Sequence, residues 1–247
     1  MGAARRERRR YFGAPLPDVG TQDGGEGIDL RDEPGDTREA RVELQKKTLA
    51  ATERNEEKRS AFRERIRGVD PERLLFVDES STNIAMVPRY ARAPKGDRAH
   101  GKAPRNWGKN VTLISSITLE GMGPSMSIQG SSDTESFSLY MKEVLAPSLK
   151  SGQIVVMDNL SVHKGAWVRD LIEQRGCQLW LLPSYSPDMN PIEEAFSKAK
   201  NLIRKAKART LQALFAVTAR ALEAINEEDA RAFFADCGYE TPRGHSL

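Results

Sequence analysis

Acidic side chains at three distant points of the sequence could together bind divalent cations. Asp78 follows the apolar run in LLFVDES, Asp158 follows the apolar run in IVVMDN, and Glu193 lies at the start of a predicted helix in NPIEEAF. Three carboxylates brought close together repel one another unless a cation neutralises them, and hard oxygen ligands select Mg²⁺ or Mn²⁺. Two such ions about 3.5 to 4 Å apart support in-line phosphoryl transfer. The trio therefore predicts phosphodiester chemistry at a two-metal site.

Each of these residues also has an ordinary structural explanation. An aspartate at the end of a strand is often an N-cap or turn residue, which would account for Asp78 or Asp158 taken alone. Asn190 can be the N-cap of a helix with Pro191 at its first position, and Glu193 then occupies the place of a capping-box carboxylate. The residue types alone leave both interpretations open.

Glu193 and Glu194 are adjacent, so the helix geometry must decide between them. Apolar residues from Ile192 to Ala206 recur at steps of three and four, which is the pattern of an amphipathic helix. At roughly 100° per residue, Glu193 borders the apolar face, whereas Glu194 points further toward solvent. Glu193 is therefore expected to be the one that works in a cleft.

A cluster of basic residues between the first two aspartates suggests a polyanionic partner. The segment from Arg89 to Lys109 has only Asp97 as an opposing charge, and it contains the aromatic residues Tyr90 and Trp107. Such a loop could follow a phosphate backbone while its aromatic side chains stack on bases or pack against the domain. A solvated basic loop is the alternative. The candidate DNA contacts are Arg92, Lys95, Arg98, Lys102, Arg105, Trp107 and Lys109.

Further basic residues lie close to the second and third carboxylates. A charged helix face is usually a solvated one, but the basic face after Glu193 leads away from the predicted site, which favours DNA contact. His163 could orient a phosphate or a water, or could form a hydrogen bond within its own turn, and Lys164 could contact a DNA backbone. The candidates on the helix are Lys198, Lys200, Arg204 and Lys205.

The composition limits the class of protein. The chain has 247 residues, a formal net charge of +3, 38% hydrophobic residues and 30% charged residues, which suits one globular domain with polar extensions. Cys177 and Cys237 have no metal-ligand spacing, so neither a disulfide framework nor a zinc site is indicated. The sequence has no apolar run of membrane-spanning length and no signal peptide. We expect a soluble, cytoplasmic protein with no membrane partner.

The order of predicted elements divides the chain into three parts. Residues 1–45 combine an arginine cluster with a Gly-, Pro- and acid-rich stretch and are predicted to be disordered. Residues 46–70 form a charged helical linker, and residues 71–247 form the globular domain with C-terminal helices. Strands are predicted at 74–77, 111–119, around 126–128, at 153–159 and at 178–182, and helices at 134–145, 164–174, from 191 onward and at 211–226.

This βββαβαβα order predicts an α/β fold with a mixed five-stranded sheet flanked by helices. If the first strand and the IVVMDN strand are neighbours, Asp78 and Asp158 converge at one edge of that sheet, where sites of α/β proteins form.

Three blocks of the sequence resemble the catalytic blocks of DDE transposases of the mariner superfamily, specifically its bacterial insertion-sequence branch. The blocks are FVDES, VVMDNLSVHK and LPSYSPDMNPIEEAF. The 34 residues between Asp158 and Glu193 match the spacing that this branch uses between its second and third carboxylates, which selects Glu193 over Glu194. The resemblance runs from about Lys46 to Tyr239 and includes RAPKGDR and NWGKNVTLIS.

The resemblance implies an RNase H-like catalytic fold in which Asp78, Asp158 and Glu193 bind two Mg²⁺ or Mn²⁺ ions. It also implies nicking at transposon ends, followed by attack of the freed 3′-hydroxyl on target DNA, typically at a TA dinucleotide. The implied partners are transposon-end and target DNA and a second copy of the chain in an active homodimer. The implied location is the bacterial cytoplasm, in association with the nucleoid.

The amino-terminal part departs from the family pattern. Full-length relatives have helix-turn-helix modules before the catalytic domain, whereas residues 1–45 show no pair of amphipathic helices. We therefore expect either a separately encoded helix-turn-helix DNA-binding subunit or a truncated copy. Two other functions stay open on the sequence: an RNase H-like nuclease without strand transfer, and a catalytically silent DNA-binding remnant.

Overall fold

The structure is a computed structural model that describes residues 52–88, 90–106, 108, 110–159 and 165–240. These residues belong to one compact unit, Leu49–Leu247. The segment 1–45, for which disorder is predicted, and the candidate DNA contacts Trp107, Lys109, His163 and Lys164 lie outside the described residues.

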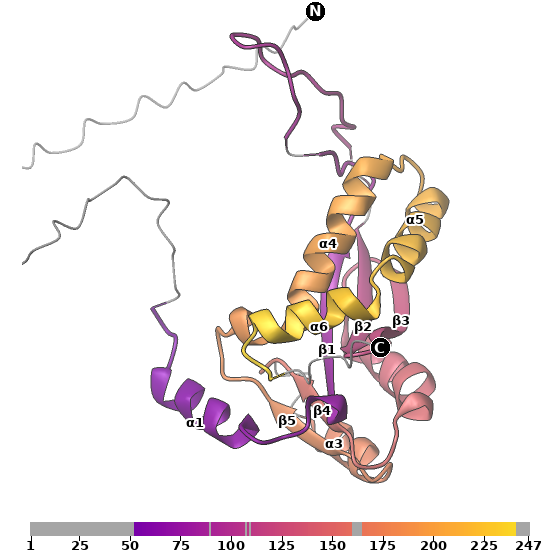
Figure 1. The fold of residues 1–247 in the computed structure, drawn as a ribbon. Helices are drawn as coiled ribbons and strands as arrows, with labels where there is room; N and C mark the ends of the chain where they lie inside the picture. The colour runs from indigo at the N-terminus through magenta and orange to yellow at the C-terminus, as the bar shows by residue number, and fades with distance from the viewer. Residues whose placement is uncertain (1–51, 89, 107, 109, 160–164, 241–247) are drawn as a thin grey trace, which may run out of the picture. The chain divides into compact units, whose positions relative to one another are not determined.

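A mixed five-stranded sheet forms the centre of this unit, as the order of predicted elements indicated (Figure 1). The strand order is β3-β2-β1-β4-β5; the pairs β3–β2 and β2–β1 are antiparallel, and the pairs β1–β4 and β4–β5 are parallel. The strands are β1 Leu74–Thr82, β2 Val111–Thr118, β3 Gly121–Gln129, β4 Ile154–Met157 and β5 Gln178–Leu181.

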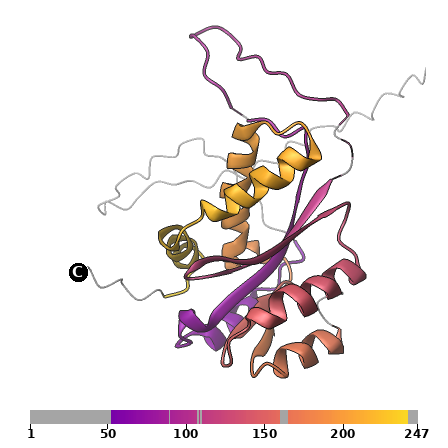
Figure 2. The ribbon, with the colours of Figure 1, turned by 90° about the vertical axis from the view of Figure 1, so that its right-hand side faces the viewer.

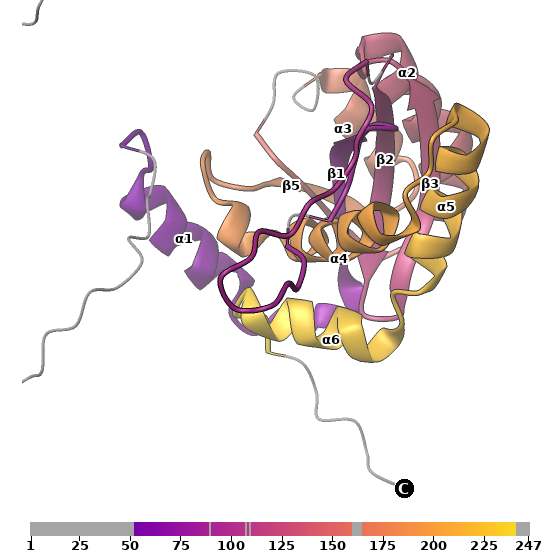
Figure 3. The same ribbon diagram turned by 90° about the horizontal axis from the view of Figure 1, so that it is seen from above.

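Helices cover both faces of the sheet (Figures 2 and 3). One face packs against α2 Thr134–Leu139, which continues as a wide helical turn over Tyr140–Leu145, and against α3 Ala166–Glu173. The other face packs against α4 Pro191–Ala206, α5 Leu211–Glu223 and α6 Glu227–Asp236. In the described ranges no helix is long and apolar enough to cross a membrane.

Strand alternation divides the core between these two faces. Leu75 and Val77 of β1 are buried in the cluster under α2 and α3, whereas Leu74 and Phe76 are buried in the cluster under α4, α5 and α6. Successive strand residues point to opposite faces, so β1 must be apolar at consecutive positions to be covered on both sides. By the same alternation, Asp78 lies on the α4 face.

The helix predicted over 211–226 is present as α5, although it ends three residues earlier, and the helix α6 that follows it was not predicted. Helix α5 ends at Glu223, and Asn226 then begins α6. The Asn226 side chain accepts a hydrogen bond from the backbone N–H of Asp229, and the Asp229 side chain accepts one from the backbone N–H of Asn226. This capping box is readable in the sequence as Asn-x-x-Asp, but an Asp in place of the usual Glu or Gln weakens the signal.

The charged segment before the sheet contains helix α1, Glu56–Ile66. Phe62 is buried and meets the Trp180 ring of β5 edge-on, with ring centroids 6.5 Å apart. The Arg65 guanidinium lies 3.7 Å from the centroid of the same ring, at cation–π distance. Helix α1 therefore packs against the domain through β5.

Because α4 is held on the sheet by its apolar face, removing its largest buried side chain should destabilise the fold. Phe196 is 1% exposed. We expect Phe196→Ala to lower the free energy of unfolding by about 3 to 5 kcal/mol in urea denaturation, through lost burial and the cavity left behind. Leu139→Ala is the control, because Leu139 is 52% exposed and its loss should cost less than about 1 kcal/mol. Equal losses would contradict the packing assigned to α4.

Candidate active site

A cavity of about 360 Å³ lies between the middle of β1, the end of β4 and the N-terminus of α4. The three predicted carboxylates line it together, although they come from three separate parts of the chain. The lining residues are Asp78, Asp158, Asn159, Leu182, Pro183, Ser184, Tyr185, Ser186, Pro187, Asn190 and Glu193.

Strand pairing brings the two aspartates together. Strands β1 and β4 are parallel neighbours, as the convergence of Asp78 and Asp158 required, and their last paired residues are Val77 and Met157. Asp78 is the next residue of β1, and Asp158 directly follows the last residue of β4. The expectation that Asp78 ends its strand was wrong, however, because β1 continues to Thr82 through pairing with β2. Asp78 thus lies where β1 has lost its β4 neighbour but remains rigid, and it is not a cap or a turn residue.

Two hydrogen bonds orient the Asp78 carboxylate, which is 8% exposed. Its Oδ1 accepts from the backbone N–H of Glu79 at 2.6 Å, and its Oδ2 accepts from the Asn190 side-chain amide at 2.7 Å. The first acidic side chain of the cavity is therefore fixed by β1 and by the start of α4.

The start of α4 differs from the sequence expectation in two respects. Asn190 is the N-cap and Pro191 is the first helical residue, as expected, but the Asn190 side chain makes no capping hydrogen bond. The expectation that Glu194 points furthest toward solvent was wrong. Glu194 is half-buried and Glu193 is exposed at the cavity, since α6 packs beside α4. Burial and the nearby charge of Asp236 raise the pKa of Glu194.

The loop between β5 and α4 completes the wall of the cavity. The Asn159 side-chain amide, directly after Asp158, donates to Ser184 Oγ at 2.9 Å. Tyr185 has a φ of 58° and is 56% exposed. A left-handed backbone at a bulky residue costs about 1 to 2 kcal/mol and is typical of functional sites. Sequence reasoning missed Asn159, Tyr185 and Asn190, although each lies inside one of the quoted blocks.

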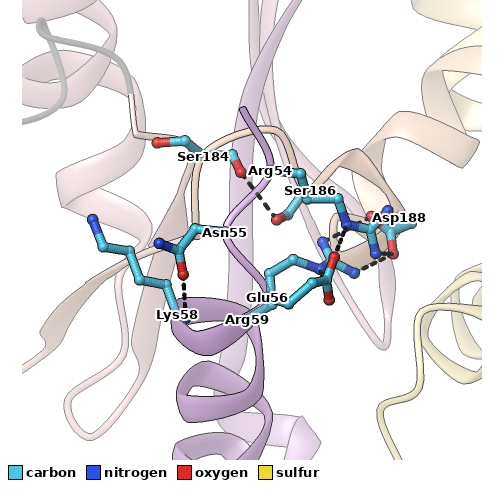
Figure 4. Close-up of polar contacts among 8 residues, drawn as sticks. All are labelled: Arg54, Asn55, Glu56, Lys58, Arg59, Ser184, Ser186 and Asp188. Atoms are coloured by element: carbon cyan, nitrogen blue, oxygen red, sulfur yellow. Dashed lines mark hydrogen bonds and ion pairs between the residues drawn. The ribbon is translucent and has the colours of Figure 1, made fainter. Parts of the chain in front are cut away.

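Helix α1 anchors this loop through an ion pair between the buried Arg59 guanidinium and the half-exposed Asp188 carboxylate (Figure 4). The Arg59 guanidinium is fully buried, and its two terminal nitrogens donate to Asp188 Oδ1 at 3.0 Å and Oδ2 at 2.6 Å. Arg54 adds a longer contact to the same carboxylate at 3.5 Å. Burial acts to raise the pKa of Asp188, but the hydrogen bonds and charge of Arg59, with the charge of Arg54, outweigh it, so the pKa of Asp188 is lowered.

The donor set of the cavity suits a hard divalent cation. Asp78, Asp158 and Glu193 supply carboxylate oxygens, and Asn190 lines the same cavity with a buried Oδ1 that has no hydrogen-bond partner among the described residues. In the described part of the chain, however, no group of three or more His, Cys, Asp or Glu side chains is gathered tightly enough to hold a metal ion. Like charges repel, so side-chain rotation is needed to bring the three carboxylates onto a shared cation.

The predicted basic loop is exposed along the part that the structure describes. Tyr90 is 91% exposed, so of its two predicted roles it does not pack against the domain. The Arg209 guanidinium donates to the carbonyl oxygens of Ile84 at 2.7 Å and Met86 at 3.2 Å, which ties the segment after α4 to the base of the loop. The exposed basic residues of the loop are Arg92, Lys95, Arg98, Lys102 and Arg105.

The predicted basic face of α4 is only partly available. Lys198 forms an ion pair with Asp229 of α6, so its charge is offset within the protein. Lys200 and Arg204 are partly buried, and Arg204 donates to Asn201 Oδ1 at 3.0 Å, whereas Lys205 is exposed. The basic charge on α4 is therefore concentrated toward its C-terminal end, near the base of the loop.

The lowered pKa of Asp188 predicts how the ion pair affects stability with pH. A carboxyl group with a lower pKa in the folded state adds stability above its unfolded pKa and loses it as the pH falls through the folded value. We expect Asp188→Asn to be less stable than the parent protein at pH 7 in urea denaturation. The difference should vanish as the pH falls below the ordinary value of 3.8.

Asp97→Asn in the exposed loop is the control for this series, and its stability should follow that of the parent at every pH. A stability difference between the parent and Asp188→Asn that persists unchanged into strong acid would show that the ionised pair is not its cause.

Comparison with known proteins places this geometry in a family. The family model of the DDE superfamily endonuclease matches residues 73–215. The Tc1 transposase of Caenorhabditis elegans is 26% identical over 161 residues, which is 61% of this chain and 59% of that protein.

Two solved structures of the Mos1 transposase share the fold. The Mos1 strand transfer complex aligns with a TM-score of 0.60 and 16% identity over 81% of this chain and 63% of the Mos1 chain. The Mos1 mariner paired end complex with Mg aligns with a TM-score of 0.61 and 12% identity over 80% and 65% of the two chains. The five-stranded sheet with its flanking helices is therefore an RNase H-like fold.

The chain spans less than two thirds of the length of each of these three relatives. The family model nevertheless covers more than half of the chain, from before β1 into α5, and includes all three carboxylates of the cavity. The chain belongs to the DDE superfamily endonuclease family.

Proposed function

We propose that this chain is the catalytic part of a transposase, which cleaves DNA at transposon ends and joins the freed ends to target DNA. The observation that carries the proposal is that Asp78, Asp158 and Glu193, from β1, the end of β4 and the start of α4, line one cavity in a DDE endonuclease domain. The similarity to Tc1 transposase and to Mos1 in its strand transfer complex supports DNA strand transfer as the reaction.

The three carboxylates would hold two Mg²⁺ or Mn²⁺ ions. The paired end complex of Mos1 with Mg supports this assignment, as does the oxygen-only donor set of the cavity. Such ions activate the attacking water or hydroxyl and stabilise the leaving oxygen of the phosphodiester.

The carboxylates of this site differ in how firmly the protein holds them. Asp78 is held by two hydrogen bonds in the central strand, so it provides a fixed reference point. Glu193 is exposed at the first turn of α4 and can change rotamer without disturbing the core. We propose that Asp78 sets the position of the site and that Glu193 closes onto it when DNA and cations bind.

We propose that DNA contacts the exposed basic loop and the C-terminal end of α4. The contacts of Arg209 with Ile84 and Met86 support treating the two as one surface. Lys198 is left out because Asp229 pairs with it, whereas His163, Lys164, Trp107 and Lys109 stay in the proposal on their place in the sequence. The surface comprises Arg92, Lys95, Arg98, Lys102, Arg105, Lys200, Arg204 and Lys205.

The finer assignments are proposals that rest on the sequence blocks. The 34-residue spacing supports the bacterial insertion-sequence branch, and the resemblance to that branch implies a TA target and a nucleoid-associated location in the cytoplasm. We also propose an active homodimer, a separately encoded helix-turn-helix subunit, and the division into an N-terminal segment 1–45, a helical linker 46–70 and a catalytic domain 71–247.

The two adjacent glutamates of α4 provide a matched test of the carboxylate assignment. We expect Glu193→Gln to reduce nicking of labelled transposon-end DNA in Mn²⁺ by roughly 10²- to 10⁴-fold, because a lost metal ligand removes several kcal/mol of transition-state stabilisation. Glu194→Gln should retain near-parental activity, since Glu194 lies against α6 and not in the cavity. Equal effects of the two substitutions would contradict the assignment.

Asp158→Asn should likewise abolish nicking, and the reaction products separate the alternative functions. DNA joined to a target plasmid identifies a transposase, cleavage without joining identifies a nuclease, and salt-sensitive DNA binding without cleavage identifies a silent remnant. Unchanged nicking by Asp158→Asn would refute the proposed site.

The proposed DNA surface predicts a change in salt dependence. Replacing Lys95, Arg98 and Lys102 together by Ala should reduce the slope of log binding constant against log salt by about 0.9 per lost phosphate contact, hence by about 2 to 3. The control removes the same charge elsewhere, with Lys142, Lys150 and Arg175 replaced by Ala, and should leave the slope unchanged. An unaltered slope in the loop variant, measured by fluorescence anisotropy, would exclude the loop from the DNA surface.

A further inference from the structure

The side chain of Asn190 forms its hydrogen bond with Asp78 in the acidic cavity and not with the backbone of its own helix. It occupies the N-cap of α4, where an asparagine side chain usually accepts a hydrogen bond from the first turn, but it makes no such bond. Its amide nitrogen instead donates to Asp78 Oδ2 at 2.7 Å, across 112 positions of sequence. The side chain is 3% exposed and lines the cavity.

The chemistry of the contact fixes which way the Asn190 amide points. An ionised carboxylate only accepts hydrogen bonds, so the atom of Asn190 that faces Asp78 must be the nitrogen. The amide oxygen Oδ1 therefore points away from Asp78, and it is buried with no partner among the described residues. The hydrogen bond to Asp78 is thus the one side-chain bond of Asn190 in the described part of the chain, although buried polar atoms usually all have partners.

The backbone around Asn190 is held from two sides. The Tyr239 hydroxyl donates to the carbonyl oxygen of Met189 at 2.6 Å, and Arg59 binds Asp188. Pro191 then restricts the chain directly after Asn190. An amide placed this firmly can orient a carboxylate, whereas an amide on a loose loop could not.

We propose that Asn190 is a positioning residue of the cation site. Its nitrogen holds Oδ2 of Asp78 while the Glu79 N–H holds Oδ1, so the carboxylate presents a fixed orientation to a divalent cation. This inference rests on the proposed function, because it requires Asp78 to be a metal ligand.

Asn190→Ser tests the inference with binding of Mn²⁺ alone. Serine is as good an N-cap as asparagine, but its hydroxyl is too short to reach Asp78. Partners of metal ligands typically change metal affinity 10- to 100-fold, so we expect the half-saturating Mn²⁺ concentration to rise by about that factor. The readout is the electron paramagnetic resonance signal of free Mn²⁺ in titrations of the full chain. Nicking by the variant should recover toward the parental rate at saturating Mn²⁺.

The matched control is Asn226→Ser, the same substitution at the N-cap of α6. Asn226 does cap its helix and is not among the residues that line the cavity, so Mn²⁺ affinity should not change. Far-ultraviolet circular dichroism checks folding, and Asn190→Gly, also tolerated at N-caps, replaces the serine variant if that variant does not fold.

The outcomes separate this inference from the proposed function. Parental Mn²⁺ affinity in folded Asn190→Ser or Asn190→Gly overturns the role of Asn190 while Asp78 remains a ligand. Asp78→Asn is measured alongside and should bind Mn²⁺ far more weakly than the parent. If the parent binds no Mn²⁺, or if Asp78→Asn binds it as the parent does, the proposed metal site fails and this inference fails with it.

Discussion

Repulsion among three carboxylates around one cavity is the constraint on which the rest of the structure depends. A chain that brings Asp78, Asp158 and Glu193 to the same place must hold each from outside, because the three favour separation. Asp78 is part of the central strand and is bonded by Glu79 and Asn190. Asp158 is placed by the parallel pairing of β4 with β1, and Glu193 is placed by the packing of α4 on the sheet. The two-sided core supplies the rigidity that an acidic cavity cannot supply for itself.

Support for the cavity extends to parts of the chain far from it in sequence. Arg59 of α1 is fully buried against Asp188, so a helix outside the sheet determines where the loop before α4 lies. Tyr239, after α6, bonds to Met189 in the same loop. Removing Asp188 would leave the buried charge of Arg59 without compensation, which makes this contact a sensitive point in the fold. Segments at both ends of the described chain thus meet at the loop that presents Asn190 and Glu193.

Acidic and basic side chains occupy separate parts of the molecule, although the net charge is small. Carboxylates surround the cavity, whereas basic side chains occupy the exposed loop after β1 and the C-terminal end of α4. The cavity attracts cations, and the surrounding surface suits a polyanion. Intramolecular pairs reduce that surface, since Lys198 is neutralised by Asp229 and Arg209 binds backbone carbonyl groups at the base of the loop. Counting basic residues along a helix therefore overstates what is available to DNA.

The sequence by itself determined the order of the strands, the helices up to α5 and the acidic character of the site, because apolar periodicity and carboxylates after apolar runs are local signals. That β1 and β4 are parallel neighbours, which brings Asp78 and Asp158 together, was only a condition in the sequence and was decided by the fold. Tertiary structure alone decided the rest. Strand β1 continues past Asp78 because β2 pairs with it. Glu194 is half-buried because α6 packs on α4, and the only sequence signal for α6 is a weak capping box. Asn190 has the signature of an N-cap, yet its side chain bonds to a residue 112 positions away. A sequence pattern indicates the local structure that a segment favours by itself. The hydrogen-bond partner of a polar side chain depends on which segments the fold brings into contact.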